Sequence, residues 1–184
     1  MAQTKGVSFV NAKAFAEERR AGAWAETLER LSPADRDALE SIIAVGWYDL
    51  DLYARMIRVL DSVLGRGDLA LLSELGRYGA ERDLTTIQRL FFRLASPAYA
   101  IEKIAEYWRR FHDTGTWNVA RVGEHHVTGS LDDWGVVDAA LCAELVAYMA
   151  RVIELVGGKN ATMLHPRCRA RGAKRCEFEL SWES

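Results

Sequence analysis

The sequence predicts an α+β fold, in which a helical N-terminal half precedes a β-hairpin, a core helix and a second β-hairpin. Over most of the first 114 residues, apolar side chains recur at three- and four-residue spacing, which is typical of amphipathic helices. After residue 115, short alternating segments flank one long apolar stretch. We expect one domain, 1–184, with a helical region over residues 1–114 and a hairpin–helix–hairpin region over residues 115–184 that forms a small antiparallel sheet.

Two helix starts carry the same local signal, a serine followed by a proline. Ser32-Pro33 and Ser96-Pro97 each place a capping hydroxyl before a residue that suits the first helical turn, because proline lacks an N–H that would have no partner there. The second start leads into a helix that ends near Phe111. Further helices are predicted at 11–20, 25–31, 52–63, 68–78 and 84–94.

The C-terminal region is predicted to contain four strands around one helix. The strands are expected at 116–121, 126–131, 161–165 and 176–182, and the helix at 137–156. Polar and apolar residues alternate from 177 to 182, so one face of this strand should be buried. An isolated hairpin is marginally stable at best, so helices should cover the sheet.

Composition restricts the class of protein. The 184 residues are 49% hydrophobic and 27% charged, which is enough for one substantial core. The net charge of -2 argues against a general nucleic-acid binder. No apolar run approaches the roughly 20 residues that span a bilayer, and no secretory signal is visible, so we expect a cytoplasmic protein without a membrane span. The usual catalytic motifs are absent, so we do not expect an enzyme.

The three cysteines and one histidine form a candidate metal site. Cys168 and Cys176 lie at opposite ends of the tip of the second hairpin, and Cys142 lies in the helix between the hairpins. With His165 they would make a closed tetrahedral zinc set. His165 and Cys168 can converge only if the chain bends near Pro166. The alternative is that Cys142 is a small core residue.

Aromatic side chains form a second candidate site. The chain has six Trp, six Tyr and six Phe residues. Some of them could line a cavity between the helices and the sheet that takes a small apolar or aromatic ligand. The candidates are Trp47, Tyr48, Tyr107, Trp108, Trp117 and Trp134. The alternative is that they pack in the core.

The C-terminal segment from His165 to Phe178 resembles the ending of 4-vinyl reductase-like domains, which include the sensor domains of phenol-responsive transcription activators. In those sensors a helix cysteine, an acidic residue and two hairpin cysteines hold zinc. The resemblance implies Cys142, Cys168 and Cys176 as ligands, with His165 at the place of the acidic residue. Glu177 and Glu179 are the alternatives for the fourth ligand.

A second resemblance covers nearly the whole chain and points to an uncharacterised paralogous family of myxobacteria. It rests on five segments: Trp47-Tyr48, Gly65–Asp68, Glu74–Arg77, Ser96-Pro97 and Trp108–Gly115. The wider superfamily includes haem-based nitric oxide sensors and subunits of vesicle-tethering complexes. Its haem sensors carry a Tyr-x-Ser-x-Arg signature that this chain lacks, so we expect zinc rather than haem as the cofactor. His112, near a helix end, could be a surface group stabilised by the helix dipole or a haem ligand.

Together these features predict a non-catalytic small-molecule-sensing domain with a structural zinc site, forming a homodimer. One alternative is an assembly module of the vesicle-tethering type without a ligand pocket. The other is a reductase-like or haem-binding protein.

Overall fold

The computed structural model describes residues 1–84 and 96–184. The predicted helix 84–94 lies outside these ranges, apart from Leu84. In chain order the elements are β1 (Gln3–Lys5), α1 (Gly6–Arg19), α2 (Ala23–Arg30), α3 (Pro33–Glu40), β2 (Trp47–Asp49), α4 (Leu50–Leu64), α5 (Leu71–Asp83), α7 (Pro97–Phe111), β3 (Thr116–Gly123), β4 (His126–Asp132), α8 (Ala139–Leu155), β5 (Lys159–Arg167), the short 3₁₀ helix η1 (Arg169–Arg171) and β6 (Cys176–Glu183). The predicted order of a helical half, hairpin, helix and hairpin is confirmed.

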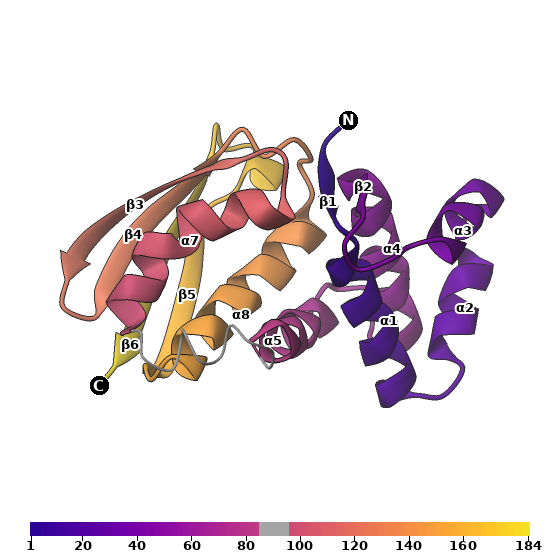
Figure 1. The fold of residues 1–184 in the computed structure, drawn as a ribbon, viewed down its shortest axis with the longest axis horizontal. Coiled ribbons are helices and arrows are strands. Elements are labelled where there is room, and N and C mark those ends of the chain that lie inside the picture. The colour runs from indigo at the N-terminus through magenta and orange to yellow at the C-terminus, as the bar shows by residue number, and fades with distance from the viewer. Residues whose placement is uncertain (85–95) are drawn as a thin grey trace.

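The two predicted hairpins join into one antiparallel sheet of order β3-β4-β6-β5. The junction is the β4–β6 pair, in which Leu131 lies opposite Cys176. Along β6 the side chains of Phe178, Leu180 and Trp182 are buried and alternate with more accessible ones, as the sequence pattern predicts. The helix α8 packs on β5 and β6, and α7 packs on β3 (Figure 1).

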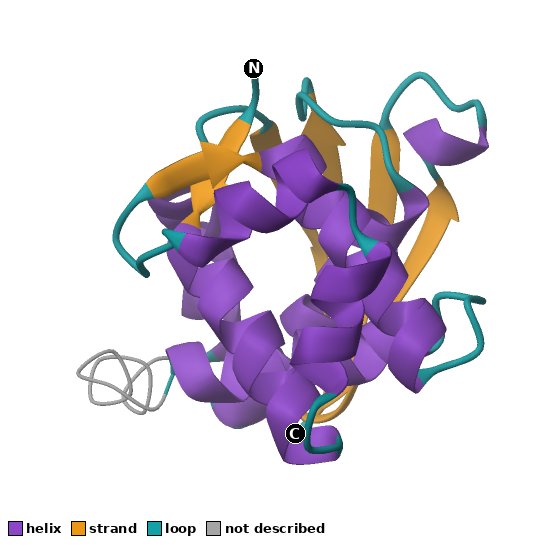
Figure 2. Ribbon diagram, turned by 90° about the vertical axis from the view of Figure 1, so that its right-hand side faces the viewer, coloured by secondary structure: helices purple, strands orange, loops and turns teal. Residues whose placement is uncertain are grey.

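The remaining helices lie at the other end of the molecule. Figure 2 views the molecule from this helical end, with strands of the larger sheet behind the helices. The helix α5 connects the two halves, because it packs on α8 and also on α1 and α4. One cluster of buried apolar residues extends through both halves and includes Phe9, Met56, Leu72, Leu141 and Phe178. A second, two-stranded sheet pairs β1 with β2, and the sequence pattern did not predict it.

Local signals set two helix starts as predicted. The Ser32 hydroxyl accepts a hydrogen bond from the Asp35 N–H at 3.1 Å, and the Ser96 hydroxyl accepts one from the Tyr99 N–H at 3.3 Å. Within the described ranges of the chain, we find no helix whose length and apolar character would let it cross a membrane.

Glycine lets α5 and α8 approach closely. A Cβ atom at Gly76 would lie 2.2 Å from the carbonyl oxygen of Glu144 and 2.9 Å from the backbone nitrogen of Tyr148. A Cβ at Gly79, almost one turn further along α5, would meet only the Tyr148 ring, at 3.6 Å. Gly76 therefore fixes the separation of the two backbones, whereas Gly79 has space beside it.

Candidate functional site

A cavity of about 160 Å³ lies between the helical half and the α7–α8 layer. Residues of α1, α4, α5, α7 and α8 line it, together with Trp134 from the loop before α8. Six of the lining side chains are aromatic: Tyr53, Tyr107, Trp108, Phe111, Trp134 and Tyr148. A cavity of about 150 Å³ with apolar walls holds one benzene molecule, so this space matches a compound with a single ring.

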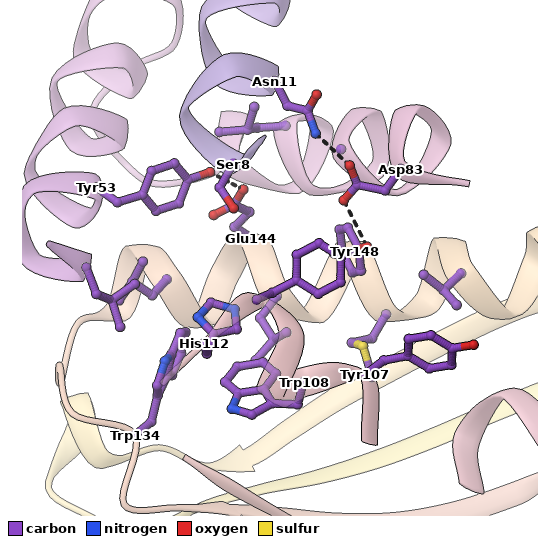
Figure 3. A pocket seen from close by; sticks show the side chains of 18 of the residues that line it. Ser8, Asn11, Tyr53, Asp83, Tyr107, Trp108, His112, Trp134, Glu144 and Tyr148 are labelled. Atoms are coloured by element: carbon purple, nitrogen blue, oxygen red, sulfur yellow. Dashed lines mark hydrogen bonds between the residues drawn. The ribbon is translucent and has the colours of Figure 1, made fainter. Parts of the chain in front are cut away.

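Polar groups from four helices meet at this cavity (Figure 3). The Tyr53 hydroxyl donates to Glu144 Oε1 at 2.6 Å, which links α4 to α8. The Tyr148 hydroxyl donates to Asp83 Oδ2 at 3.1 Å, and Asn11 Nδ2 donates to Asp83 Oδ1 at 2.9 Å, which links α8 and α1 to α5. The cavity thus combines aromatic walls with two carboxylates that its own tyrosines orient.

Both carboxylates hold their protons more tightly than usual. Removal from water raises the pKa of Glu144 to about 7; the Tyr53 hydrogen bond opposes this change and the charge of Asp83 adds to it. Removal from water also raises the pKa of Asp83, against the hydrogen bonds from Asn11 and Tyr148 and the nearby charge of Arg82. Near neutral pH the Glu144 carboxyl therefore exchanges between its charged and neutral forms.

His112 follows the last residue of α7 and lines the same cavity. Its ring stacks on Trp108 at 4.0 Å between centroids and meets the edge of Trp134 at 5.6 Å. Removal from water lowers the pKa of His112 to about 3, so the imidazole is neutral. Its Nδ1 atom is buried and has no hydrogen-bond partner among the described residues. His112 is thus a cavity residue, and of the two alternatives the surface group at a helix end is wrong.

The structure divides the six predicted aromatic residues. Tyr107, Trp108 and Trp134 line the cavity. Trp117 is buried nearby and meets Trp108 edge to face at 5.9 Å, although it does not line the cavity. Trp47 and Tyr48 lie in β2, apart from the other four. The sequence pattern did not single out Glu144, although it is the one acidic residue among positions 139–153 of α8, which are mostly apolar.

The predicted cysteine–histidine set converges at one point. Cys142 lies in the first turn of α8, His165 in β5, Cys168 just after β5, and Cys176 at the start of β6. One potential ligand atom from each of the four residues lies within 4.8 Å of the others. The pairing of β5 with β6 is irregular between Leu164 and Arg167, at the bend that the convergence of His165 and Cys168 requires.

The spacing of the sulfur atoms matches coordination better than a disulfide. Cys142 Sγ lies 4.0 Å from Cys176 Sγ and 3.8 Å from Cys168 Sγ. For a metal–sulfur bond of about 2.3 Å, two sulfur ligands at tetrahedral corners are about 3.8 Å apart, whereas a disulfide bond is about 2.05 Å long. Both distances from Cys142 Sγ are therefore close to the edge length of such a coordination tetrahedron.

The imidazole and the backbone around the cluster fit the same interpretation. His165 stacks on Phe178 at 4.3 Å, and its buried Nε2 has no hydrogen-bond partner among the described residues. The hydrogen bond from Cys142, helped by His165 and the Arg169 N–H, lowers the pKa of Cys176 to about 4, while the same contact raises the pKa of Cys142. Glu177, an alternative fourth ligand, pairs instead with Arg175 at 2.9 Å and Arg167 at 3.4 Å.

No family model and no curated protein sequence matches this chain. Solved structures do resemble it. An H-NOX protein from S. oneidensis in the Fe(II)NO ligation state is 13% identical, with a TM-score of 0.76 over 98% of this chain and 99% of that one. An unliganded Fe(II) H-NOX protein from K. algicida is 9% identical, with a TM-score of 0.74 over 98% of this chain and 97% of that one.

These comparisons correct the expected cofactor. Another similar structure, at 9% identity and a TM-score of 0.73, was solved to probe haem distortion in the H-NOX family. Haem is thus a prosthetic group found in proteins that share this fold. The expected preference for zinc over haem was wrong. The expected likeness to haem-based nitric oxide sensors is confirmed at the level of the fold, whereas the likenesses to 4-vinyl reductase-like domains and to the myxobacterial family stay predictions.

The described residues fit a haem in one respect and not in two others. The neutral imidazole of His112, with its buried and unpartnered Nδ1, suits an axial ligand. A porphyrin is much larger than the single ring that about 150 Å³ holds, so the aromatic walls would have to move apart. Its two propionates need cationic partners, yet the charged side chains among the described lining residues are Asp83 and Glu144.

The structural agreement with the H-NOX protein from S. oneidensis over nearly the full length of both chains shows that this chain has the H-NOX fold.

Proposed function

We propose that this chain is a non-catalytic sensing domain that binds a small molecule, of about the size of one aromatic ring, in the cavity between its two halves. The observation that carries the proposal is the cavity itself, because it combines aromatic walls with a few oriented polar groups. This combination is typical of small-molecule sites. The cavity lies between α5 and α7–α8, so its occupancy can favour one packing of the two halves over another.

The test uses three single-ring probes: phenol, 2-phenylethanol and 2-phenylethylamine. We expect saturable binding of at least one probe by calorimetry, with a change in tryptophan fluorescence because Trp108 and Trp134 line the cavity. In Gly79→Leu the new side chain should occupy the space beside the Tyr148 ring and abolish that binding. Leu69→Ala, at a residue outside the described cavity lining, is the control and should bind as the parent does. If none of the probes binds, the proposal is wrong.

We also propose that the cysteine–histidine cluster holds a structural metal ion. The four ligands Cys142, His165, Cys168 and Cys176 would close a tetrahedron and leave no open position for a reacting molecule. Elemental analysis of the purified protein identifies the ion. The ion would hold the tip of the β5–β6 hairpin against the start of α8, because Cys142 comes from α8 and the other three ligands come from the hairpin.

We propose that the protein is cytoplasmic and forms a homodimer. Ile43, Val45 and Trp47 are exposed close together in the sequence beside β2, which gives a second copy an apolar surface to cover. Native mass spectra of the purified protein report the oligomer, the metal and any bound molecule together.

Haem is the second candidate ligand, and His112 is the observation that favours it. Titration with hemin should then give a Soret band whose position changes in His112→Ala. His126→Ala is the matched control, because His126 lies in β4 outside the cavity lining. An identical spectrum for the parent and His112→Ala would show that His112 does not hold the iron.

A further inference from the structure

Among the residues that the structure describes, Glu144 has no oppositely charged partner at the cavity. Its described hydrogen-bond partner is the neutral hydroxyl of Tyr53, and the charge that acts on it most clearly is the negative charge of Asp83. An ionised carboxylate removed from water is costly unless it is paired. Tyr53 supplies one hydrogen bond to Oε1 but no charge. When Glu144 is ionised, none of the described lining residues therefore supplies the charge that would neutralise it.

Each helix that packs around the cavity adds neutral or acidic groups near Glu144, and none adds a cation among the described lining residues. The titratable groups that line the cavity come from α4, α5, α8 and the C-terminal end of α7, whereas α1 contributes the uncharged Ser8 and Asn11. The titratable groups are Tyr53, Asp83, Tyr107, His112 and Tyr148. His112 is neutral because its pKa is lowered to about 3. The positive charge of Arg82 acts on Asp83.

The rest of the cavity wall suits a cation with an apolar body. A positive charge is attracted to the faces of Trp and Tyr rings, and the attraction grows when water is excluded. Trp108, Trp134 and Tyr148 line this space, and its volume of about 160 Å³ limits the body to one ring. An anion would meet two carboxylates instead, and a neutral ligand would leave the charge of Glu144 unpaired.

Building on the function proposed above, we propose that the cavity selects a small aromatic amine, whose ammonium group pairs with Glu144 while its ring lies among the aromatic side chains. Glu144 is then a specificity-determining residue, and Tyr53 positions it by donating to Oε1. The hydrogen bonds from Tyr148 and Asn11 engage Asp83, so Glu144 is the carboxylate that the ligand neutralises.

The experiment compares 2-phenylethylamine with 2-phenylethanol, which has nearly the same shape and no charge, by calorimetry at pH 6 and pH 8. We expect the amine to bind the parent protein about tenfold or more tightly than the alcohol at pH 8, as for a charge pair that excludes water. The preference should shrink at pH 6, because the pKa of Glu144 is raised to about 7 and the carboxyl is then mostly protonated.

Glu144→Gln keeps the shape of the side chain and an oxygen for the Tyr53 hydroxyl while removing the charge. It should lose the preference for the amine and keep the affinity for the alcohol. Glu106→Gln, at an exposed position of α7 outside the described cavity lining, is the matched control and should behave as the parent does. Thermal unfolding of both variants checks that they are folded.

The outcomes separate this inference from the function on which it rests. If the alcohol binds as well as the amine, or if Glu144→Gln keeps the preference, the cavity binds small molecules but Glu144 does not select a cation. If neither probe binds and phenol does, the inference fails while the cavity remains a ligand site. If none of the three binds, both fail.

Discussion

Replacing Cys168 with serine is expected to destabilise the protein by on the order of 4 kcal/mol, or roughly 10 °C in melting temperature for a chain of this size. The Cys168 side chain is 4% exposed, and its Sγ lies 3.8 Å from Cys142 Sγ. With serine there, the proposed metal ion would lose a thiolate that ties the hairpin tip to α8. Differential scanning calorimetry measures the change, and elemental analysis should show that the variant has lost its metal.

A chelator and two histidine variants, one inside and one outside the cluster, provide the controls for this prediction. A strong chelator should lower the melting temperature of the parent protein and leave Cys168→Ser almost unchanged. His165→Gln should resemble Cys168→Ser, whereas His126→Gln should melt as the parent does, because His126 lies outside the cluster. A purified protein that contains no metal, with a melting temperature insensitive to the chelator, would show that the cluster is a packed group of thiols.

Gly76→Ala is expected to destabilise the protein by about 3 kcal/mol or more, because overpacking that moves the backbone is costly. Its new Cβ would lie 2.2 Å from the carbonyl oxygen of Glu144 and 2.9 Å from the nitrogen of Tyr148. Backbone atoms of a helix cannot rotate away as a flexible side chain can. The helices α5 and α8 would therefore move apart, and urea denaturation measures the loss in the free energy of unfolding.

The same substitution at Gly79 should raise the free energy of unfolding instead of lowering it. There the new Cβ meets the Tyr148 ring at 3.6 Å, an ordinary contact, and the helix gains about 0.5–1 kcal/mol because alanine is the better helix former. Positions 76 and 79 lie three residues apart on the same helix. The gain in helix propensity is therefore the same in both variants and cancels when their stabilities are compared. If Gly76→Ala and Gly79→Ala are equally stable, close approach of the two backbones does not limit this fold.

The features that the sequence predicted are those with local causes. Ser32 and Ser96 cap their helices through N–H groups three residues later, so a short segment contains the whole signal. The alternation along β6 likewise follows from one buried face. The convergence of Cys142 with the hairpin cysteines was predictable because the strands bring the tip residues together and the helix has to cover the sheet.

The features that were missed depend on contacts between distant segments. The pairing of Gln3–Lys5 with Trp47–Asp49 joins two three-residue strands that are too short to show an alternating pattern. His112 follows a helix end, where an exposed position is the ordinary outcome, and only the packing of α7 turns it into the cavity. An aromatic-lined cavity was expected between the helices and the sheet, but the cavity is formed by five helices, whose relative positions no local pattern contains.

The missing Cβ of Gly76 also bears on the size of the cavity. Leu75, Gly79 and Asp83 of α5 and Glu144, Leu145 and Tyr148 of α8 all line the cavity, so the separation of these two helices contributes to its size. A larger residue at position 76 would move the two helices apart, which would enlarge the cavity and lower the stability of the protein. The size of the cavity and the thermal stability of the protein are therefore linked, because one added methyl group at position 76 would enlarge the first and lower the second.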